Sequence, residues 1–244
     1  MDKGILRYLA LTLMLFLFGV SSSYAIPATY GDAIHRTTSW QELATYENGS
    51  PASDYGVFWS VNGGNSWGQD TNLYVGQEVK FMFNMHKENV GTHYADFSKT
   101  WVDWGQDGSF DTTDVVGFYY QELLTNEDGN IDSWNTPNVS DYTFFSDTFT
   151  ITDELIGDLY LRSRVTCSHS LAQSMGYYGW DDQFNLSVDA YSNDFSAIGS
   201  LFQGEVEEWQ ITVSAAPVPE PATMLLLGTG LIGFATANRK WLKK

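Results

Sequence analysis

Apolar and polar residues alternate over several short stretches between residues 26 and 214. Every second residue of 79–85 is apolar, and Leu159, Leu161 and Val165 follow nearly the same period. Because the side chains of a strand point alternately to its two faces, this period predicts strands with one face in a core and one toward solvent. Further strands are predicted at 56–61, 100–103, 115–120, 142–151 and 206–213.

The stretches between these strands are rich in Gly, Asn and Asp, which favours tight turns. The segment 39–46 fits a short helix or a loop, and 123–140 is polar and irregular. Many short strands joined by turns predict an all-β fold, an antiparallel β-sandwich. We expect it to form one domain over residues 26–214.

The first 25 residues have a different pattern. Lys3 and Arg7 precede an apolar run at 8–20, and serines and Ala25 follow it. This order of basic, apolar and small residues predicts a signal peptide over 1–25, a helix cleaved after Ala25. The alternative is an uncleaved N-terminal anchor, which the shortness of the apolar run disfavours.

The C-terminal end contains a second apolar run. Residues 222–237 carry no charge, and four basic residues close the chain. As a helix this run is about 24 Å long, slightly short of a hydrocarbon core of about 30 Å, and the flanking Trp241 and lysines extend its reach. We expect a transmembrane helix over 222–237, with the basic cluster cytoplasmic and the preceding chain outside. A permanent single-pass anchor and a buried core helix are the alternatives.

The order of parts within 215–244 favours a sorting signal. Pro219, Glu220 and Pro221 come first, the apolar run follows, and Arg239 and Lys240 begin the basic end. This tail resembles the PEP-CTERM sorting domain. The resemblance implies recognition by an exosortase of exopolysaccharide-producing Gram-negative bacteria, transient membrane insertion, and then release to the cell surface or extracellular matrix. Export machinery and exopolysaccharide are the other partners it implies.

The charge distribution narrows the choice of partners. The chain has 12 basic and 30 acidic residues, a net charge of −18. Half of the basic residues lie in the two ends, whereas all acids except Asp2 and Glu220 lie between them. Such a surface excludes nucleic acid as a partner and favours cations, or it simply keeps the protein soluble. Cys167 is the only cysteine, so no disulfide forms within the chain.

An acidic loop follows the strand predicted at 100–103. Calcium binds six to eight oxygen ligands, and acids at positions one, five, nine and twelve with glycine at six suit a loop that wraps one ion. Gly105 stands at position three, where such loops carry Asp or Asn. The alternative is an Asp-Gly turn with solvated acids. The predicted metal ligands are Asp103, Asp107, Ser109, Asp111 and Asp114.

Three segments together resemble the GEVED domain. They are 101–111, the Arg162-Ser163-Arg164 strand, and 204–209, which reads Gly-Glu-Val-Glu-Glu-Trp. Tyr30-Gly31-Asp32-Ala33 is also similar to the usual start of that domain. The resemblance implies a β-sandwich of secreted and surface proteins, with Glu208 and Trp209 replacing the usual Asp and Tyr.

Glu205 and Glu207 fall on one face of the last predicted strand, so their charges repel unless a cation or an arginine lies between them. They either complete a calcium site with the acidic loop or pair with Arg162 and Arg164. The arginines are the favoured partners of at least one.

The sequence thus predicts an exported, non-enzymatic surface or matrix protein, stabilised by calcium. One alternative is a carbohydrate-binding module. Another is a secreted hydrolase, which needs two acids within catalytic distance. For the carbohydrate-binding alternative the candidate rings are Trp59, Trp67, Trp101 and Trp104.

Overall fold

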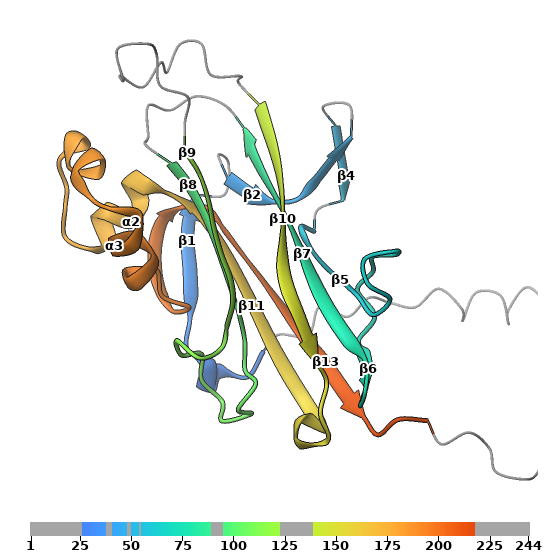
Figure 1. Ribbon diagram of the computed structural model, residues 1–244. Helices are drawn as coiled ribbons and strands as arrows, with labels where there is room; N and C mark the ends of the chain where they lie inside the picture. The colour runs from blue at the N-terminus through green and yellow to red at the C-terminus, as the bar shows by residue number, and fades with distance from the viewer. Residues whose placement is uncertain are drawn as a thin grey trace, which may run out of the picture.

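The computed structural model describes residues 26–37, 41–47, 50–53, 55–88, 95–122 and 139–217. These residues form mainly β-strands, with a few short helices (Figure 1). The predicted signal peptide at 1–25, the predicted span at 222–237 and most of 123–140 lie outside the described residues. Within the described residues, no helix has the length and apolar character needed to cross a membrane.

One of the two larger sheets has four antiparallel strands, in which β7 is central. It pairs with β10 on one side and with β5 and β2 on the other. The bounds are β2 (Gln41–Leu43), β5 (Val57–Ser60), β7 (Glu78–Glu88) and β10 (Val139–Thr150). A separate hairpin of β3 (Thr45–Glu47) and β4 (Ser50–Ser53) lies between β2 and β5 in sequence.

The other larger sheet has five strands in the order β6-β13-β11-β8-β9. All pairs are antiparallel except β6 with β13, which is parallel. The bounds are β6 (Asn72–Tyr74), β8 (Ala95–Val102), β9 (Val115–Glu122), β11 (Gly157–Cys167) and β13 (Glu205–Ser214).

A hydrophobic core joins the two sheets. Phe81 and Phe83 of β7 lie in one buried cluster with Leu159 and Leu161 of β11. The alternation predicted at 79–85 is confirmed, since its four apolar positions are at most 1 % exposed. The predicted all-β fold is therefore confirmed as a mostly β structure with antiparallel and mixed sheets.

The second face of the five-stranded sheet is also covered, contrary to the alternation predicted for 159–165. Arg162 and Arg164 are 2 % and 1 % exposed, and every residue of β8 is buried. The cover consists of the N-terminal segment with η1 (Ala28–Tyr30), the parallel pair β1 (Ala33–Thr37) and β12 (Gly199–Gln203), and a helical lobe. Its elements come from far along the chain, so no local period reveals them.

The helical lobe comprises residues 168–195, with α2 (Ser168–Ser174), η3 (Trp180–Asn185) and α3 (Val188–Asp194). Phe97 and Trp101 of β8 share a second core cluster with Leu171 and Tyr191 of this lobe. The lobe was not predicted, since helices of seven residues span too few turns to show a period. The helix or loop predicted at 39–46 is wrong, because β2 and part of β3 occupy it. The remaining helix is η2 (Asp153–Leu155).

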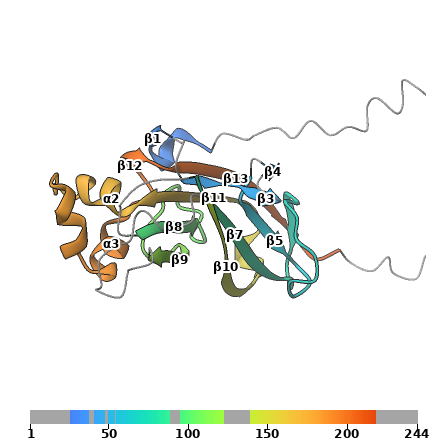
Figure 2. The ribbon, with the colours of Figure 1, turned by 90° about the horizontal axis from the view of Figure 1, so that it is seen from above.

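The lobe and the end of β13 lie at opposite ends of the molecule. Figure 1 and the view turned by 90° in Figure 2 both place α2 and α3 at one end and the last residues of β13 at the other. The described chain continues from β13 to Pro217, so the C-terminal tail begins at the end remote from the lobe.

Candidate functional site

The loop 103–114 joins β8 to β9 and is held by its own carboxylates. Asp103 is 1 % exposed and accepts hydrogen bonds from the amides of Asp107 (3.2 Å) and Gly108 (3.0 Å). The Tyr30 hydroxyl also donates to it, at 2.5 Å, and burial together with this carboxylate raises the pKa of Tyr30. Gly108, the glycine at position six of the loop, has φ 84°, which glycine adopts without strain where the backbone turns sharply.

The acids at the end of the loop also bind backbone. Asp114 accepts from the amides of Trp104 (3.2 Å) and Asp111 (2.9 Å), and burial raises its pKa. Asp111 is exposed and accepts from the amide (2.6 Å) and the hydroxyl (2.7 Å) of Thr113, which lower its pKa. Each carboxylate therefore closes one turn of the loop.

Ser109 gives its hydroxyl to Asp107 at 2.7 Å, and its amide donates to the same oxygen at 2.9 Å. The five predicted calcium ligands thus lie in one loop, and the polar side chains bond mainly to the loop itself. Among the residues that the structure describes, no three His, Cys, Asp or Glu side chains are grouped so that they could hold a metal ion.

Glu205 and Glu207 point toward the four-stranded sheet. Glu205 accepts from the Leu43 amide at 2.7 Å, and Glu207 accepts from the amides of Gly56 (2.8 Å) and Val57 (3.2 Å). The two glutamates therefore fasten β13 to the backbone at the edge of the other sheet. Burial raises the pKa of Glu207 to about 8, and the neighbouring Glu205 charge adds to the rise.

The structure does not bring these glutamates to the acidic loop. Asp103 contacts Tyr30, whose ring packs on Tyr160 and whose carbonyl binds Arg162. That is the face opposite to Glu207, since side chains alternate along β11 and β13.

Arg162 binds a different glutamate from the two that were proposed. Its Nε and Nη2 donate to Glu208, the residue opposite it in the β11–β13 register. Its Nη1 donates to the carbonyls of Tyr30 (3.3 Å) and Ala197 (3.0 Å), and its Nη2 donates to Gly31 (2.9 Å). One buried guanidinium thereby joins β13, the N-terminal segment and the loop that precedes β12.

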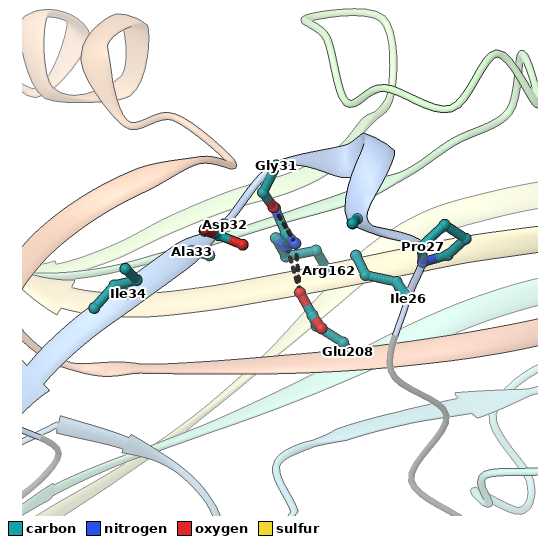
Figure 3. Close-up of a pocket in the computed structure, with 9 residues that line it drawn as sticks. Ile26, Pro27, Gly31, Asp32, Ala33, Ile34, Arg162 and Glu208 are labelled. Carbon is teal, nitrogen blue, oxygen red and sulfur yellow. Dashed lines mark hydrogen bonds and ion pairs between the residues drawn. The ribbon is translucent and has the colours of Figure 1, made fainter.

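A shallow pocket of about 210 Å³ lies over this ion pair. In Figure 3 the Arg162 guanidinium reaches Gly31 on one side and Glu208 on the other, with Ile26 and Pro27 beside them. Because the donors of Arg162 are already in use, the pocket offers a ligand little beyond the acids Asp32 and Glu208.

Arg164 is buried against neutral partners. Its guanidinium donates to the carbonyls of Ser196 (2.8 Å), Ile198 (3.0 Å) and Gly199 (3.0 Å) and to Nε2 of His35 (3.1 Å). Burial and the neighbouring Arg162 lower the pKa of Arg164 to about 10. The two arginines of β11 thus attach the N-terminal segment and the residues before β12 to the second face of the five-stranded sheet.

The structure explains why glycine is the first residue of the motif at 204–209. Gly204 has φ 112°, and a β-carbon there would lie 1.8 Å from the carbonyl oxygen of Val165. Only glycine allows the chain between β12 and β13 to approach β11 this closely.

Two of the four tryptophans singled out for carbohydrate binding are in the core. Trp59 and Trp101 are each 3 % exposed, and Trp104 packs on Phe149 at 5.3 Å. Trp67 lies against Phe145, with ring centroids 5.4 Å apart. These tryptophans do not form an exposed row of rings, which weighs against the carbohydrate site predicted on them.

Sequence reasoning missed a cluster of exposed rings in the helical lobe. Four of the eight residues of 177–184 are aromatic, a density that was visible in the sequence. They are exposed by 39 % to 77 % of their surface. The four are Tyr177, Tyr178, Trp180 and Phe184.

The predicted sorting residues Pro219, Glu220, Pro221, Arg239 and Lys240 lie outside the described residues. A comparison with curated proteins found no match. A family model described as the PEP-CTERM protein-sorting motif matches residues 217–240. The chain therefore carries a PEP-CTERM motif, which indicates export and exosortase-dependent sorting to the cell envelope.

Proposed function

We propose that this chain is a non-enzymatic protein of the cell surface or extracellular matrix, displayed there after an exosortase has processed its tail. The observation that carries the proposal is the sorting motif at 217–240, which begins directly after the last strand of the β-rich body. The span at 222–237 is then a temporary membrane anchor, and the signal peptide at 1–25 starts export.

The body, residues 26–214, is proposed to be a GEVED-like β-sandwich. The motif strand β13 pairs directly with the Arg-x-Arg strand β11, and Arg162 binds Glu208 across this pair. The buried arginines and glutamates join segments distant in sequence, which is a structural role. The acids singled out by sequence are bonded to backbone amides, and this supports a scaffold over a hydrolase.

Calcium in the loop 103–114 is a separate proposal. Its support is the set of four carboxylates within twelve residues and the turn at Gly108. Each carboxylate oxygen has two lone pairs, so an oxygen that already accepts one amide can still bind a cation.

The test of the main proposal follows an epitope-tagged chain in cells with and without the exosortase. We expect a smaller, surface-located product in the first strain and a longer, membrane-bound product in the second. Replacing Pro219 and Pro221 by alanine should mimic loss of the exosortase, whereas Ala216→Ser, just before the matched residues, should not. Equal mass and location in both strains would contradict processing by the exosortase.

A further inference from the structure

The exposed rings of the helical lobe form the largest group of solvent-facing aromatic side chains close together in sequence among the described residues. Tyr178 is 77 % exposed, and Tyr177, Trp180 and Phe184 are 45 %, 44 % and 39 % exposed. Single exposed apolar residues are ordinary, but a concentration of them marks an interaction surface. The exposed faces of these rings are therefore a candidate interaction surface.

The segment that carries the rings is fixed to the rest of the lobe by hydrogen bonds of a buried side chain. Gln183 is fully buried; its amide accepts from the Ser168 hydroxyl (2.7 Å) and donates to the Trp180 carbonyl (3.0 Å). The Tyr191 hydroxyl donates to the Gln183 carbonyl at 2.7 Å. These bonds fix the turn that carries Trp180 and Phe184, so a ligand meets a surface that needs little ordering.

Polar side chains accompany the rings. Trp180 packs on His169, with ring centroids 4.5 Å apart, and His169 contacts the Gln173 amide at 3.0 Å. Asp181 and Asn185 stand on the same turn. The segment 176–185 contains no aliphatic side chain.

This combination fits a sugar better than a protein. A pyranose has an apolar C–H face that stacks on an aromatic ring and hydroxyls that bond to carboxylates, amides and imidazoles. The centre of a protein interface is depleted of acidic side chains, whereas Asp181 and Asp182 stand between the rings here.

The negative charge of the lobe favours neutral polysaccharides over acidic ones. Residues 168–198 contain Asp181, Asp182, Asp189 and Asp194 and no lysine or arginine. Uronate, sulfate or phosphate groups on a glycan would be repelled. The surface therefore suits a neutral polysaccharide.

The position of the lobe suits a protein that is displayed on the cell surface and held at its C-terminal end; this step rests on the proposed function. The lobe that carries the rings lies at the end of the molecule remote from the end of β13, after which the sorting motif begins (Figures 1 and 2). A chain held by its tail thus presents the lobe outward. We propose that Tyr177, Tyr178, Trp180 and Phe184 form a binding surface for neutral polysaccharide of the extracellular matrix.

The test is electrophoresis of the purified exported protein in native gels that contain one soluble polysaccharide each. The neutral arms are laminarin, hydroxyethylcellulose, soluble starch and galactomannan, and alginate is the acidic arm. We expect retardation in at least one neutral gel and none in alginate. Trp180→Ala and Tyr178→Ala should each weaken binding at least tenfold, and both residues are exposed enough to be removed without unfolding.

Tyr74→Ala is the matched control, because this ring is 37 % exposed at the opposite end of the molecule, in β6. It should bind as the unchanged protein does. The proposal is overturned if no neutral gel retards the protein, if alginate retards it equally, or if Trp180→Ala leaves the retardation unchanged. A protein partner lost in Trp180→Ala without retardation by any polysaccharide also overturns it. None of these outcomes depends on exosortase processing, so the two proposals fail separately.

Discussion

His35 and Arg164 share a hydrogen bond that requires a neutral imidazole. Nε2 of His35 accepts from Arg164, so Nδ1 carries the proton and donates to the Gln203 carbonyl at 3.0 Å. Burial and the Arg164 charge lower the pKa of His35 from 6.5 to about 4. Protonation of His35 would place two cations in contact.

The protein should therefore lose stability as the pH falls from 6.5 to 4. In this window the unfolded chain binds a proton at His35 that the folded chain does not, so acid favours unfolding, by on the order of 2 kcal/mol. Urea unfolding at several pH values measures this slope. His35→Gln keeps a donor and an acceptor without titrating and should reduce the slope; an unchanged slope in this variant would rule out His35 as its source.

Glu207 should produce the opposite slope at higher pH. Its pKa rises from 4.5 in the unfolded chain to about 8 in the folded one, so only the folded chain keeps the proton in between. Stability then falls as the pH rises from 4.5 to 8. Glu207→Gln keeps an acceptor for the Gly56 amide but not for the Val57 amide, which costs about 1 kcal/mol at every pH; relative to the unchanged protein, the variant should gain about 2 kcal/mol of stability between pH 5 and pH 8. Equal destabilisation at both pH values would mean that the ionised carboxylate is the required form.

At the scale of elements, the loop 103–114 offers a direct test of calcium. Gly105 occupies the position where calcium loops carry Asp or Asn, and a β-carbon there would lie 3.8 Å from the nearest Asp103 oxygen, an ordinary contact. Gly105→Asn therefore fits and adds an oxygen ligand. We expect about 10 mM calcium to raise the unfolding midpoint of the unchanged protein, and lower calcium to suffice for the variant.

Gly68→Asn is the control for this prediction, because its β-carbon would meet nothing within 4 Å and it lies outside the loop. Its calcium response should equal that of the unchanged protein. If calorimetry finds no calcium effect on any of the three proteins, the loop carboxylates serve only its backbone.

A buried lysine of the sheet holds the C-terminal end of α3, in addition to the core contacts of that helix. Lys99 of β8 is 7 % exposed and donates to the carbonyls of Ser192 (2.6 Å) and Phe195 (3.0 Å) at the end of α3. Lys99→Met should leave these carbonyls without their donor and cost about 2 kcal/mol.

In Lys99→Met, the amides of 188–195 should exchange hydrogen faster, whereas the exchange rates in β11 should not change. Lys80→Met, which removes a lysine of the other sheet that lies over Phe145 at 5.2 Å, should leave exchange in the lobe unchanged. Uniformly faster exchange in the Lys99 variant would mean that the lobe does not unfold separately.

The elements also show what the sequence can predict. The strand β7 was predicted because one of its faces packs on a single core, which imposes a period of two. The burial of Arg162 and Arg164 was not predicted, because the carbonyls that accept hydrogen bonds from their guanidinium groups, at 30–31 and 196–199, lie more than 30 residues away in sequence. Likewise, the rings of 177–184 look like core residues in sequence, but in the structure Gln183 is the buried residue, held by the Ser168 hydroxyl, and the rings are exposed.

At the scale of the whole molecule, the lobe and the end of β13 lie at opposite ends, so anchoring through the proposed span would give the protein a defined orientation. In a strain without exosortase, the proposed span at 222–237 should keep the tail in the membrane, with the last residues of β13 close to it. The only natural cysteine, Cys167, is fully buried, so a cysteine introduced at the surface is labelled alone.

A bulky maleimide applied to spheroplasts of that strain should label Tyr178→Cys at least several-fold faster than Ala215→Cys, because bilayer and headgroups hinder only the second site. Both positions are exposed, so in the detergent-solubilised protein the rates should converge. Equal rates in spheroplasts would mean that the body lies along the membrane, and the lobe would then be as near to the lipid as the tail. A large difference that disappears in detergent would place the aromatic surface where a matrix polysaccharide can reach it.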